Sequence, residues 1–330
     1  MESLRVTGHP AEVVETVRGW LDAADPRPLV VETSGSTGTP KRALLSRRAV
    51  LASVAATARR VGSEGRWALR LPASYVAGVQ VIVRSLVAGH DPVLDGWADA
   101  THTSLVPTQL HRMLDDAADV EALVAMDAVL LGGGPIDPGL RQRAEAAGIR
   151  VVATYGMAET CGGCVYDGYA LDGVAVALGA DGRIRLGGPT LFGGYDGDPA
   201  ATAEALVDGW FLTSDAGRLD EDGRLQVLGR LDDVVVSGGV NVPTPAVAAR
   251  LREHPDVVDA AVVGVPDEEW GHRVVAFVVG SLDLDDARDW VAVAHPRSWA
   301  PRALVMVDAL PLLGAGKVDR LALQKQATTR

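Results

Sequence analysis

A run of small hydroxyl residues and glycines near the N-terminus is the stretch of this sequence best suited to hold a phosphate group. It consists of Thr33, Ser34, Gly35, Ser36, Thr37, Gly38, Thr39, Pro40 and Lys41. Because no bulky side chain holds a ligand away, the backbone N–H groups of such a loop can converge on an anion. The hydroxyls add donors and the lysine adds a positive charge. The alternative is a polar turn after the buried strand that we expect at residues 28–31.

This loop differs from the Walker phosphate loop. The Walker motif ends in Gly-Lys-Ser/Thr and enters a helix directly, whereas here Pro40 precedes Lys41 and Arg42 follows it. Proline removes a backbone donor and disfavours the helical region for the residue before it. The pattern therefore indicates a different kind of loop for the phosphates of a nucleotide.

A second stretch, from Tyr155 to Thr160, places a carboxylate after a predicted strand. A carboxylate beside a phosphate repels it unless a cation lies between them, and Mg²⁺ commonly bridges the two. We therefore expect Glu159 to bind Mg²⁺, together with the Thr37 hydroxyl, and Tyr155 to offer a surface on which adenine stacks. The alternative is a helix start at which Glu159 is only a capping carboxylate.

Two further features are suited to a ligand. Gly132, Gly133 and Gly134 permit a flat ring to approach the backbone closely, although a tight strand-to-helix turn would use the same residues. Arg84 lies in an otherwise apolar helix expected over residues 76–88. A buried guanidinium is costly unless it is paired, and a substrate carboxylate would be such a partner. The alternative is an arginine that extends to solvent.

The composition favours a globular enzyme of two domains. The 330 residues are 48% hydrophobic and 22% charged, and the net charge of −12 argues against general nucleic-acid binding. The apolar runs are too short to cross a membrane and the N-terminus has no apolar signal core, so we expect a cytoplasmic protein without membrane insertion. Only Cys161 and Cys164 could pair. They are structural or pocket-lining thiols, or a redox or metal pair.

The elements that must position these residues alternate between strand and helix up to about residue 154. This pattern predicts an α/β fold with a mostly parallel, helix-covered sheet, in which ligands bind beyond the carboxyl ends of the strands. After Cys164, short alternating stretches predict a small β-rich subdomain. Beyond residue 230 the pattern indicates a compact α+β unit. We therefore predict a large domain over residues 1–230 and a small C-terminal α+β domain over residues 231–330.

Five motifs in order resemble the signature elements of the adenylate-forming superfamily of acyl-CoA ligases, luciferases and peptide-synthetase adenylation domains. They are Thr33–Lys41, Tyr155–Thr160, Trp210–Asp215, Gly229–Asp233 and Leu310–Arg320. The chain departs from the family pattern at Ala158, Ser214 and Leu313, where threonine, glycine and threonine are usual.

The resemblance implies a role for each motif residue. Lys317 would be the catalytic lysine, acting with Glu159, while Lys41 would serve the departing diphosphate. Asp215 would bind the ribose hydroxyls and Arg230 the ribose or a phosphate. Asp232 would be the hinge of a mobile C-terminal domain. The adenine and the acyl group would lie against a set of residues on the large domain: Gly132, Gly133, Gly134, Tyr155, Tyr75, Arg84, Ser104 and Gly163.

Within the superfamily, four stretches resemble the o-succinylbenzoate–CoA ligases of menaquinone biosynthesis: Leu71–Gly78, Arg84–Gly89, Ser104–Leu110 and Leu130–Pro135. That resemblance implies ATP, Mg²⁺ and coenzyme A as cofactor and co-substrates, and an aromatic dicarboxylate as substrate. Arg84 would meet the carboxylate that is not activated. Tyr75 stands where many relatives carry histidine, and Val240 where some carry a basic residue.

Other functions stay open on the sequence alone. They are a coenzyme A ligase for another aryl or short aliphatic acid, and an inactive adenylate-binding module. The chain is shorter than typical members of the family, with a reduced N-terminal part, which motivates the second alternative. Retention of Lys41, Glu159, Asp215 and Lys317 argues against it. The sequence does not fix the oligomeric state, and a homodimer is one option.

Overall fold

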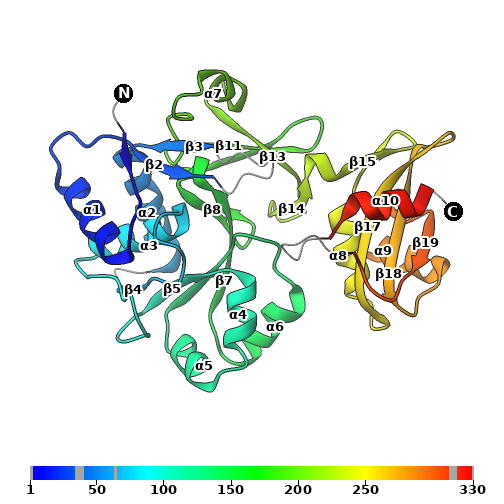
Figure 1. Cartoon of the computed structure of the whole chain (residues 1–330), viewed down its shortest axis with the longest axis horizontal. Coiled ribbons are helices and arrows are strands. Elements are labelled where there is room, and N and C mark those ends of the chain that lie inside the picture. The colour runs from blue at the N-terminus through cyan, green and yellow to red at the C-terminus, as the bar shows by residue number, and fades with distance from the viewer. Residues whose placement is uncertain (1–2, 34–40, 63–64, 312–317, 329–330) are drawn as a thin grey trace. The chain divides into compact units, whose positions relative to one another are not determined.

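The computed structural model describes residues 3–33, 41–62, 65–311 and 318–328 (Figure 1). The chain divides into two compact units. The first consists of Met1–Ala177, Arg185–Thr213 and Asp220–Leu225, and the second of Leu178–Ile184, Ser214–Leu219 and Gln226–Arg330. The expected α/β architecture with a C-terminal α+β part is confirmed, and the domain boundary between residues 230 and 231 stays a prediction.

The main sheet of the first unit has six strands and is parallel over its first four. In spatial order they are β4 (Trp67–Ala68), β5 (His102–Leu105), β6 (Ala128–Leu131), β7 (Val151–Met157), β8 (Gly162–Tyr166) and β9 (Tyr169–Ala170). Strands β4 to β7 pair in parallel, and β7 to β9 pair antiparallel. The expected strand at residues 92–94 is reduced to a single bridge between Val93 and Ala68.

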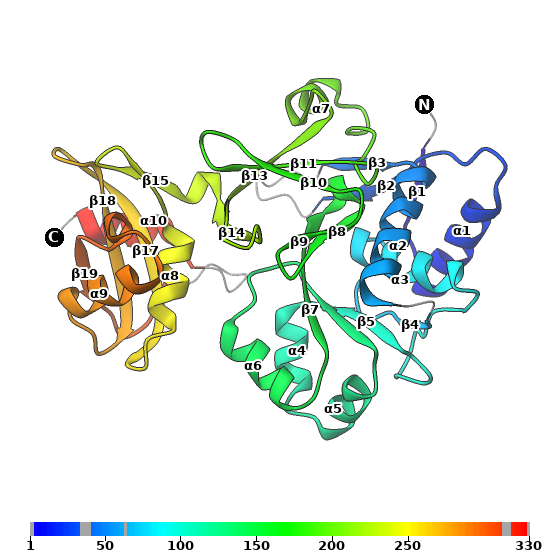
Figure 2. The same ribbon diagram turned by 180° about the vertical axis from the view of Figure 1, so that it is seen from behind.

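Helices cover both faces of this sheet. Successive residues of a strand point to opposite faces, so each strand contributes side chains to both contacts. Leu105 of β5 packs in a buried cluster with Leu110, Leu123 and Leu140. These three side chains belong to α4 (Pro107–Met113), α5 (Ala117–Val124) and α6 (Pro138–Ala146). Three residues before Leu105, His102 faces the other side, where α2 (Arg47–Val61) and α3 (Val76–Val87) lie (Figure 2). Helix α5 was not predicted.

The predicted phosphate loop joins two strands of a separate sheet. Strand β2 (Leu29–Glu32) pairs in parallel with β1 (Leu4–Arg5) and antiparallel with β3 (Arg42–Leu45). The expected strand before the loop is confirmed, but the short strand after it was missed, so the loop closes a hairpin. Ser46 then caps α2 as expected, since its Oγ accepts from the Ala49 N–H at 3.2 Å. Helix α1 (Pro10–Asp22) buries Val13, Val14, Val17 and Trp20.

Short strands follow the main sheet, as the change in sequence pattern predicted. They are β10 (Ala175–Leu178), β11 (Arg183–Gly187), β12 (Leu206–Val207), β13 (Trp210–Leu219) and β14 (Leu225–Arg230). Strand β12 pairs antiparallel with β13, and helix α7 (Pro199–Ala205), which was not predicted, precedes β12.

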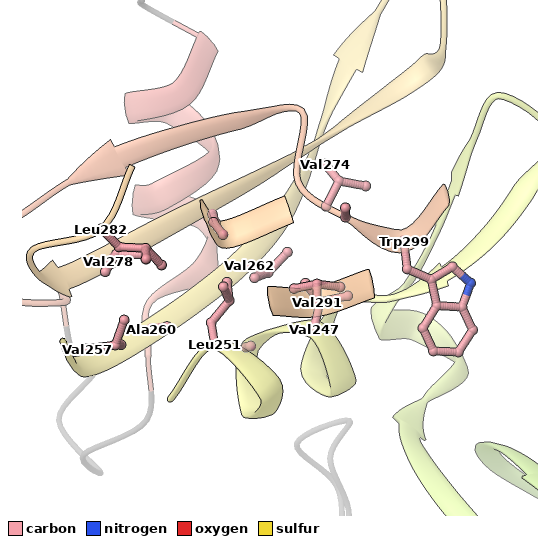
Figure 3. Packing of buried hydrophobic residues seen from close by; sticks show 14 of the residues in the cluster. Val247, Leu251, Val257, Ala260, Val262, Val274, Val278, Leu282, Val291 and Trp299 are labelled. Atoms are coloured by element: carbon pink, nitrogen blue, oxygen red, sulfur yellow. The ribbon is translucent and has the colours of Figure 1, made fainter. Parts of the chain in front are cut away.

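The second unit is built on the sheet β17-β18-β19, whose two faces bury different side chains. Figure 3 shows the cluster on one of these faces, which includes Val262, Val247 and Val291. Val262 and Val274 pack with Val247, Leu251 and Val291 on one face, whereas Val263 and Val275 pack with Leu323 on the other. The elements are β15 (Val234–Ser237), β16 (Val240–Pro243), α8 (Thr244–Arg252), β17 (Val257–Asp267), β18 (Gly271–Gly280), α9 (Leu284–Ala294), β19 (Ala303–Met306) and α10 (Arg320–Thr328). Strand β16 and helix α10 were not predicted.

Within the described ranges, none of the helices has the length and apolar content needed to cross a membrane.

Candidate active site

A tyrosine joins two of the motifs that the sequence singled out. The Tyr195 hydroxyl donates a hydrogen bond to Oε1 of Glu159 at 2.8 Å, and Lys41 Nζ lies 4.8 Å from the centre of the Tyr195 ring. Burial, followed by the Glu159 carboxylate, raises the pKa of Tyr195. The phenol therefore stays protonated and acts as a donor. Glu159 and Lys41 are thus brought together around one ring.

The backbone around Tyr195 is fixed to both motifs. The Phe192 N–H donates to the Glu159 carbonyl at 2.9 Å. Two further hydrogen bonds join this segment to β3: Leu44 N–H to the Gly194 carbonyl at 2.9 Å, and Asp196 N–H to the Arg42 carbonyl at 2.8 Å. At the base of the predicted phosphate loop, the Thr33 N–H donates to the Lys41 carbonyl at 2.8 Å. Residues 192–196 therefore hold Glu159 and the strand after the loop in one frame.

The arrangement around Glu159 fits a magnesium site. Glu159 is buried, and the Tyr195 hydroxyl engages its Oε1, which leaves Oε2 for another ligand. Mg²⁺ keeps several waters and is usually bound by one or two carboxylates plus substrate phosphates. A single carboxylate near Lys41, the last residue of the predicted phosphate loop, would meet that need. In the part of the chain that the structure describes, no group of three or more His, Cys, Asp or Glu side chains could form an all-protein metal site.

Glycines allow strands β6, β7 and β8 to approach closely next to this site. A Cβ on Gly132 would lie 2.4 Å from Thr154 Oγ1, and one on Gly163 would lie 2.9 Å from Tyr166 Cε1. A Cβ on Gly156 would lie 2.2 Å from the Gly162 carbonyl oxygen. Since real Cβ atoms do not come so near, these positions require glycine. At Gly132 the close neighbour is the protein's own Thr154, and the expected approach of a flat ring to Gly132, Gly133 and Gly134 stays a prediction.

Arg84 is buried, with 6% of its surface exposed, so the alternative of an arginine extending to solvent is wrong. Its Nη2 lies 3.2 Å from Thr57 Oγ1 and 3.4 Å from the Tyr166 hydroxyl, and its guanidinium carbon lies 5.0 Å from the centre of the Trp67 ring. Its Nε has no hydrogen-bond partner among the described residues, and no described carboxylate forms an ion pair with it. Tyr166 connects Arg84 to the Gly163 position described above.

The remaining first-unit residues lie at different depths. Ser104 is buried on β5, on the same face as His102, because the two residues are two positions apart in the strand. Tyr75 is 48% exposed at the start of α3. It precedes Arg84 by nine residues, or about 13 Å of helix. Tyr155 is half-buried within β7, and Gly133 and Gly134 are exposed after β6.

Within the second unit, Asp215 and Arg230 lie together. Arg230 Nη1 is 3.5 Å from Asp215 Oδ1, and Asp215 is buried. Asp232 lies in the short 3₁₀ turn Leu231–Asp233. Next to it, Asp233 forms an ion pair with Arg320, the first residue of α10. Ser34, Gly35, Ser36, Thr37, Gly38 and Lys317 lie outside the described residues, so their predicted roles stay predictions.

Cys161 and Cys164 are free, fully buried thiols. Burial raises the pKa of Cys164 to about 12 and also raises that of Cys161. Very little reactive thiolate therefore forms near neutral pH. This supports the structural interpretation over a redox or metal pair.

A mostly parallel sheet covered by helices, and a buried glutamate held by a tyrosine beside Lys41, are typical of a nucleotide-binding α/β enzyme. The "AMP-binding enzyme" family model matches residues 29–184, and the "AMP-binding enzyme C-terminal domain" model matches residues 246–317. The chain belongs to the AMP-binding enzyme family. The resemblance to adenylate-forming enzymes that the motifs indicated is thereby confirmed.

Within this family, the chain is similar to several individual proteins of known name or structure. A probable 2-succinylbenzoate–CoA ligase of Mycobacterium tuberculosis is 44% identical over 322 residues, which cover 90% of this chain and 84% of that protein. The structure of o-succinylbenzoate CoA synthetase (MenE) from Bacillus subtilis with the acyl-adenylate intermediate OSB-AMP has a TM-score of 0.73 at 26% identity, covering 90% of this chain and 68% of that one. Apo MatB from Rhodopseudomonas palustris has a TM-score of 0.78 at 26% identity, covering 93% and 69%.

Tyr195 is a candidate site residue that none of the sequence motifs pointed to. Its signal was the run Gly193-Gly194-Tyr195-Asp196, which follows a glycine-rich stretch and looks like a turn. The bridge between Tyr195 and Ala43 of β3 and the contact of Lys41 with the Tyr195 ring place this tyrosine beside the end of the predicted phosphate loop.

The buried histidine on β5, His102, leads to a prediction of how stability depends on pH. Burial, with a smaller effect of Arg84 and Arg150, lowers the pKa of His102 from 6.5 to about 4. Between these values the unfolded chain binds a proton that the folded protein does not bind. The free energy of unfolding should therefore decrease as the pH falls from about 6.5 to 4. Urea titrations at several pH values would measure this slope.

Substitution of His102 by Gln should flatten that slope, whereas His90→Gln, at an exposed histidine, should leave it unchanged. An equal slope in wild type and His102→Gln would contradict the assignment of the titration to His102.

Proposed function

We propose that this chain is an ATP-dependent ligase that joins o-succinylbenzoate to coenzyme A, releasing AMP and diphosphate. The family membership and the 2-succinylbenzoate–CoA ligase relatives support the reaction class. The observation that supports a dicarboxylate is Arg84, a buried cation whose described polar neighbours are the hydroxyls of Thr57 and Tyr166. A hydroxyl leaves the positive charge uncompensated, so a carboxylate of the substrate is a favourable partner.

In the proposed first step, one substrate carboxylate oxygen attacks the α-phosphorus of ATP, and diphosphate leaves. The Thr33–Lys41 loop holds the departing phosphates, and Lys317 stabilises the charge that develops at the α-phosphate. Glu159 would hold Mg²⁺, with the Thr37 hydroxyl as a second ligand. When bound, the metal supplies charge neutralisation to the phosphates. Tyr155, Gly133 and Gly134 would line the adenine.

The nucleotide sugar and the acyl group would be held by different residues. Asp215 would accept hydrogen bonds from the ribose hydroxyls, next to Arg230. Arg84 would bind the carboxylate that does not react, and Gly132, Ser104, Gly163 and Tyr75 would line the acyl group. The glycines leave room for a flat aromatic ring against the backbone.

In the proposed second step, the coenzyme A thiol attacks the acyl-adenylate carbonyl and AMP leaves. Residues 231–330 form a mobile domain that turns at Asp232, carries Lys317 away from the reacting atoms and admits the thiol. The partners are then small molecules, and the enzyme acts in the cytoplasm as a monomer or homodimer. No side-chain nucleophile is required.

A second candidate is a coenzyme A ligase for another carboxylic acid. The similarity to MatB supports this second candidate, because the TM-score of 0.78 to MatB exceeds the 0.73 to MenE. Both candidates use the same nucleotide chemistry, and they differ in what Arg84 binds.

Replacement of Lys317 by Ala should separate the two steps. We expect the rate of adenylation to fall by about 100-fold or more, as for loss of one group that stabilises transition-state charge. Conversion of preformed acyl-adenylate and coenzyme A to thioester should stay within a few-fold of wild type. Single-turnover assays of each half-reaction measure this, and Lys325→Ala on α10 is the matched control. Full retention of adenylation would exclude the role of Lys317.

Replacement of Arg84 by Ala tests the substrate. In a diphosphate-release assay with and without coenzyme A, wild type should prefer o-succinylbenzoate to benzoate. Arg84→Ala should lower kcat/KM for o-succinylbenzoate by about 100-fold, since a charge-assisted hydrogen bond is lost, and change benzoate by only a few-fold. Arg59→Ala, at an exposed arginine of α2 paired with Asp172, is the control. Equal losses with both acids would favour the second candidate.

A further inference from the structure

We infer that Tyr195 is a positioning residue that holds Glu159 and Lys41 in the geometry needed to bind a metal–nucleotide complex. The inference rests on the proposed use of ATP and a divalent cation by this site. It adds a residue that none of the predicted motifs contains.

The first support is the hydroxyl. Tyr195 donates to Oε1 of Glu159 at 2.8 Å, and no other hydrogen-bond donor contacts this buried carboxylate in the described part of the chain. A carboxylate ligand that is hydrogen-bonded through one oxygen keeps a fixed orientation and presents the other oxygen to the cation. Such outer partners of metal ligands typically change metal affinity by about 10–100-fold when they are removed.

The second support is the ring. Lys41 Nζ lies 4.8 Å from the ring centre, within the range of a cation–π contact. An aromatic face attracts an ammonium group without neutralising it. Lys41 is exposed, and no described carboxylate forms an ion pair with it, so its charge stays available to an anionic ligand. Tyr195 thus orients the Glu159 carboxylate through its hydroxyl and the Lys41 ammonium group through its ring.

The third support is the rigidity of the frame. Tyr195 is bridged to Ala43 of β3, and its N–H donates to Thr202 Oγ1 at 2.8 Å. The Phe192 N–H binds the carbonyl of Glu159 itself, and the Phe192 ring packs edge-on at 4.9 Å from that of Tyr195. The tyrosine therefore cannot shift without moving the backbone of both motifs.

The hydroxyl is tested by Tyr195→Phe, which keeps the ring. Mn²⁺ is titrated into protein with ATP and no acid substrate, and its binding is followed by electron paramagnetic resonance. We expect Tyr195→Phe to weaken Mn²⁺ binding by about tenfold. Glu159→Gln should weaken it at least as much. The double variant should bind no more weakly than Glu159→Gln alone, because the hydroxyl acts through the carboxylate.

The ring is tested by Tyr195→Leu. This variant should show the loss seen in Tyr195→Phe and, in addition, weaker binding of metal-free ATP, because Lys41 loses its contact. Tyr169→Phe is the matched control: its hydroxyl accepts from Arg224 Nε at 2.7 Å on the surface, and its loss should leave Mn²⁺ binding unchanged. In steady-state assays, Tyr195→Phe should require about tenfold more Mg²⁺ but approach the wild-type kcat at saturation.

Unchanged Mn²⁺ affinity in Tyr195→Phe, with reduced affinity in Glu159→Gln, would overturn the inference. Unchanged affinity in Glu159→Gln would overturn it as well. If Tyr195→Phe does not fold, Thr202→Val keeps the phenol and removes the acceptor of the Tyr195 N–H, and it should weaken Mn²⁺ by a smaller factor. An unchanged affinity there would contradict the proposal. A wild type that binds Mn²⁺ with ATP but forms no thioester would instead reject the proposed function alone.

Discussion

The parallel pairing of β5, β6 and β7 is the constraint on which the first unit depends. Parallel strands end at the same edge of a sheet, so the residues that follow them must share that edge. Here these include the Gly132–Gly134 run after β6 and Glu159 after β7. The antiparallel return of β8 then brings Gly162 and Gly163 back along β7, and only glycines at Gly156 and Gly163 allow so close an approach.

Two cations that the proposed function uses, Lys41 and Arg84, lie over aromatic rings, and no described carboxylate forms an ion pair with either. Lys41 lies over Tyr195, and the Arg84 guanidinium lies over Trp67. An aromatic face stabilises a positive charge and leaves it able to attract an anion. In a chain with a net charge of −12, sites for phosphate and carboxylate groups must create positive potential locally. At the proposed sites, a cation that packs on an aromatic ring would provide this potential without an internal ion pair that a ligand must break.

The sequence predicted the fold class and the buried position of the Arg84 helix, because periodic apolar patterns report burial directly. It missed strand β3 since Arg42–Leu45 is short and lies between a loop and a helix cap. It also missed Tyr195. A hydrogen bond between residues 159 and 195 depends on the pairing of residues 193–196 with β3, which no local pattern encodes. The predicted ligand roles rest on family resemblance, since side-chain type alone does not identify a ligand.

The central claim is that a carboxylate of the substrate attacks the α-phosphorus of ATP. Turnover of o-succinylbenzoate labelled with ¹⁸O in both carboxylates, with ATP and coenzyme A, tests it most directly by mass spectrometry of the products. One ¹⁸O should appear in AMP, because the bridging oxygen of the acyl-adenylate leaves with the nucleotide when the thiol attacks. Unlabelled AMP, or label in inorganic phosphate together with release of ADP, would contradict the account.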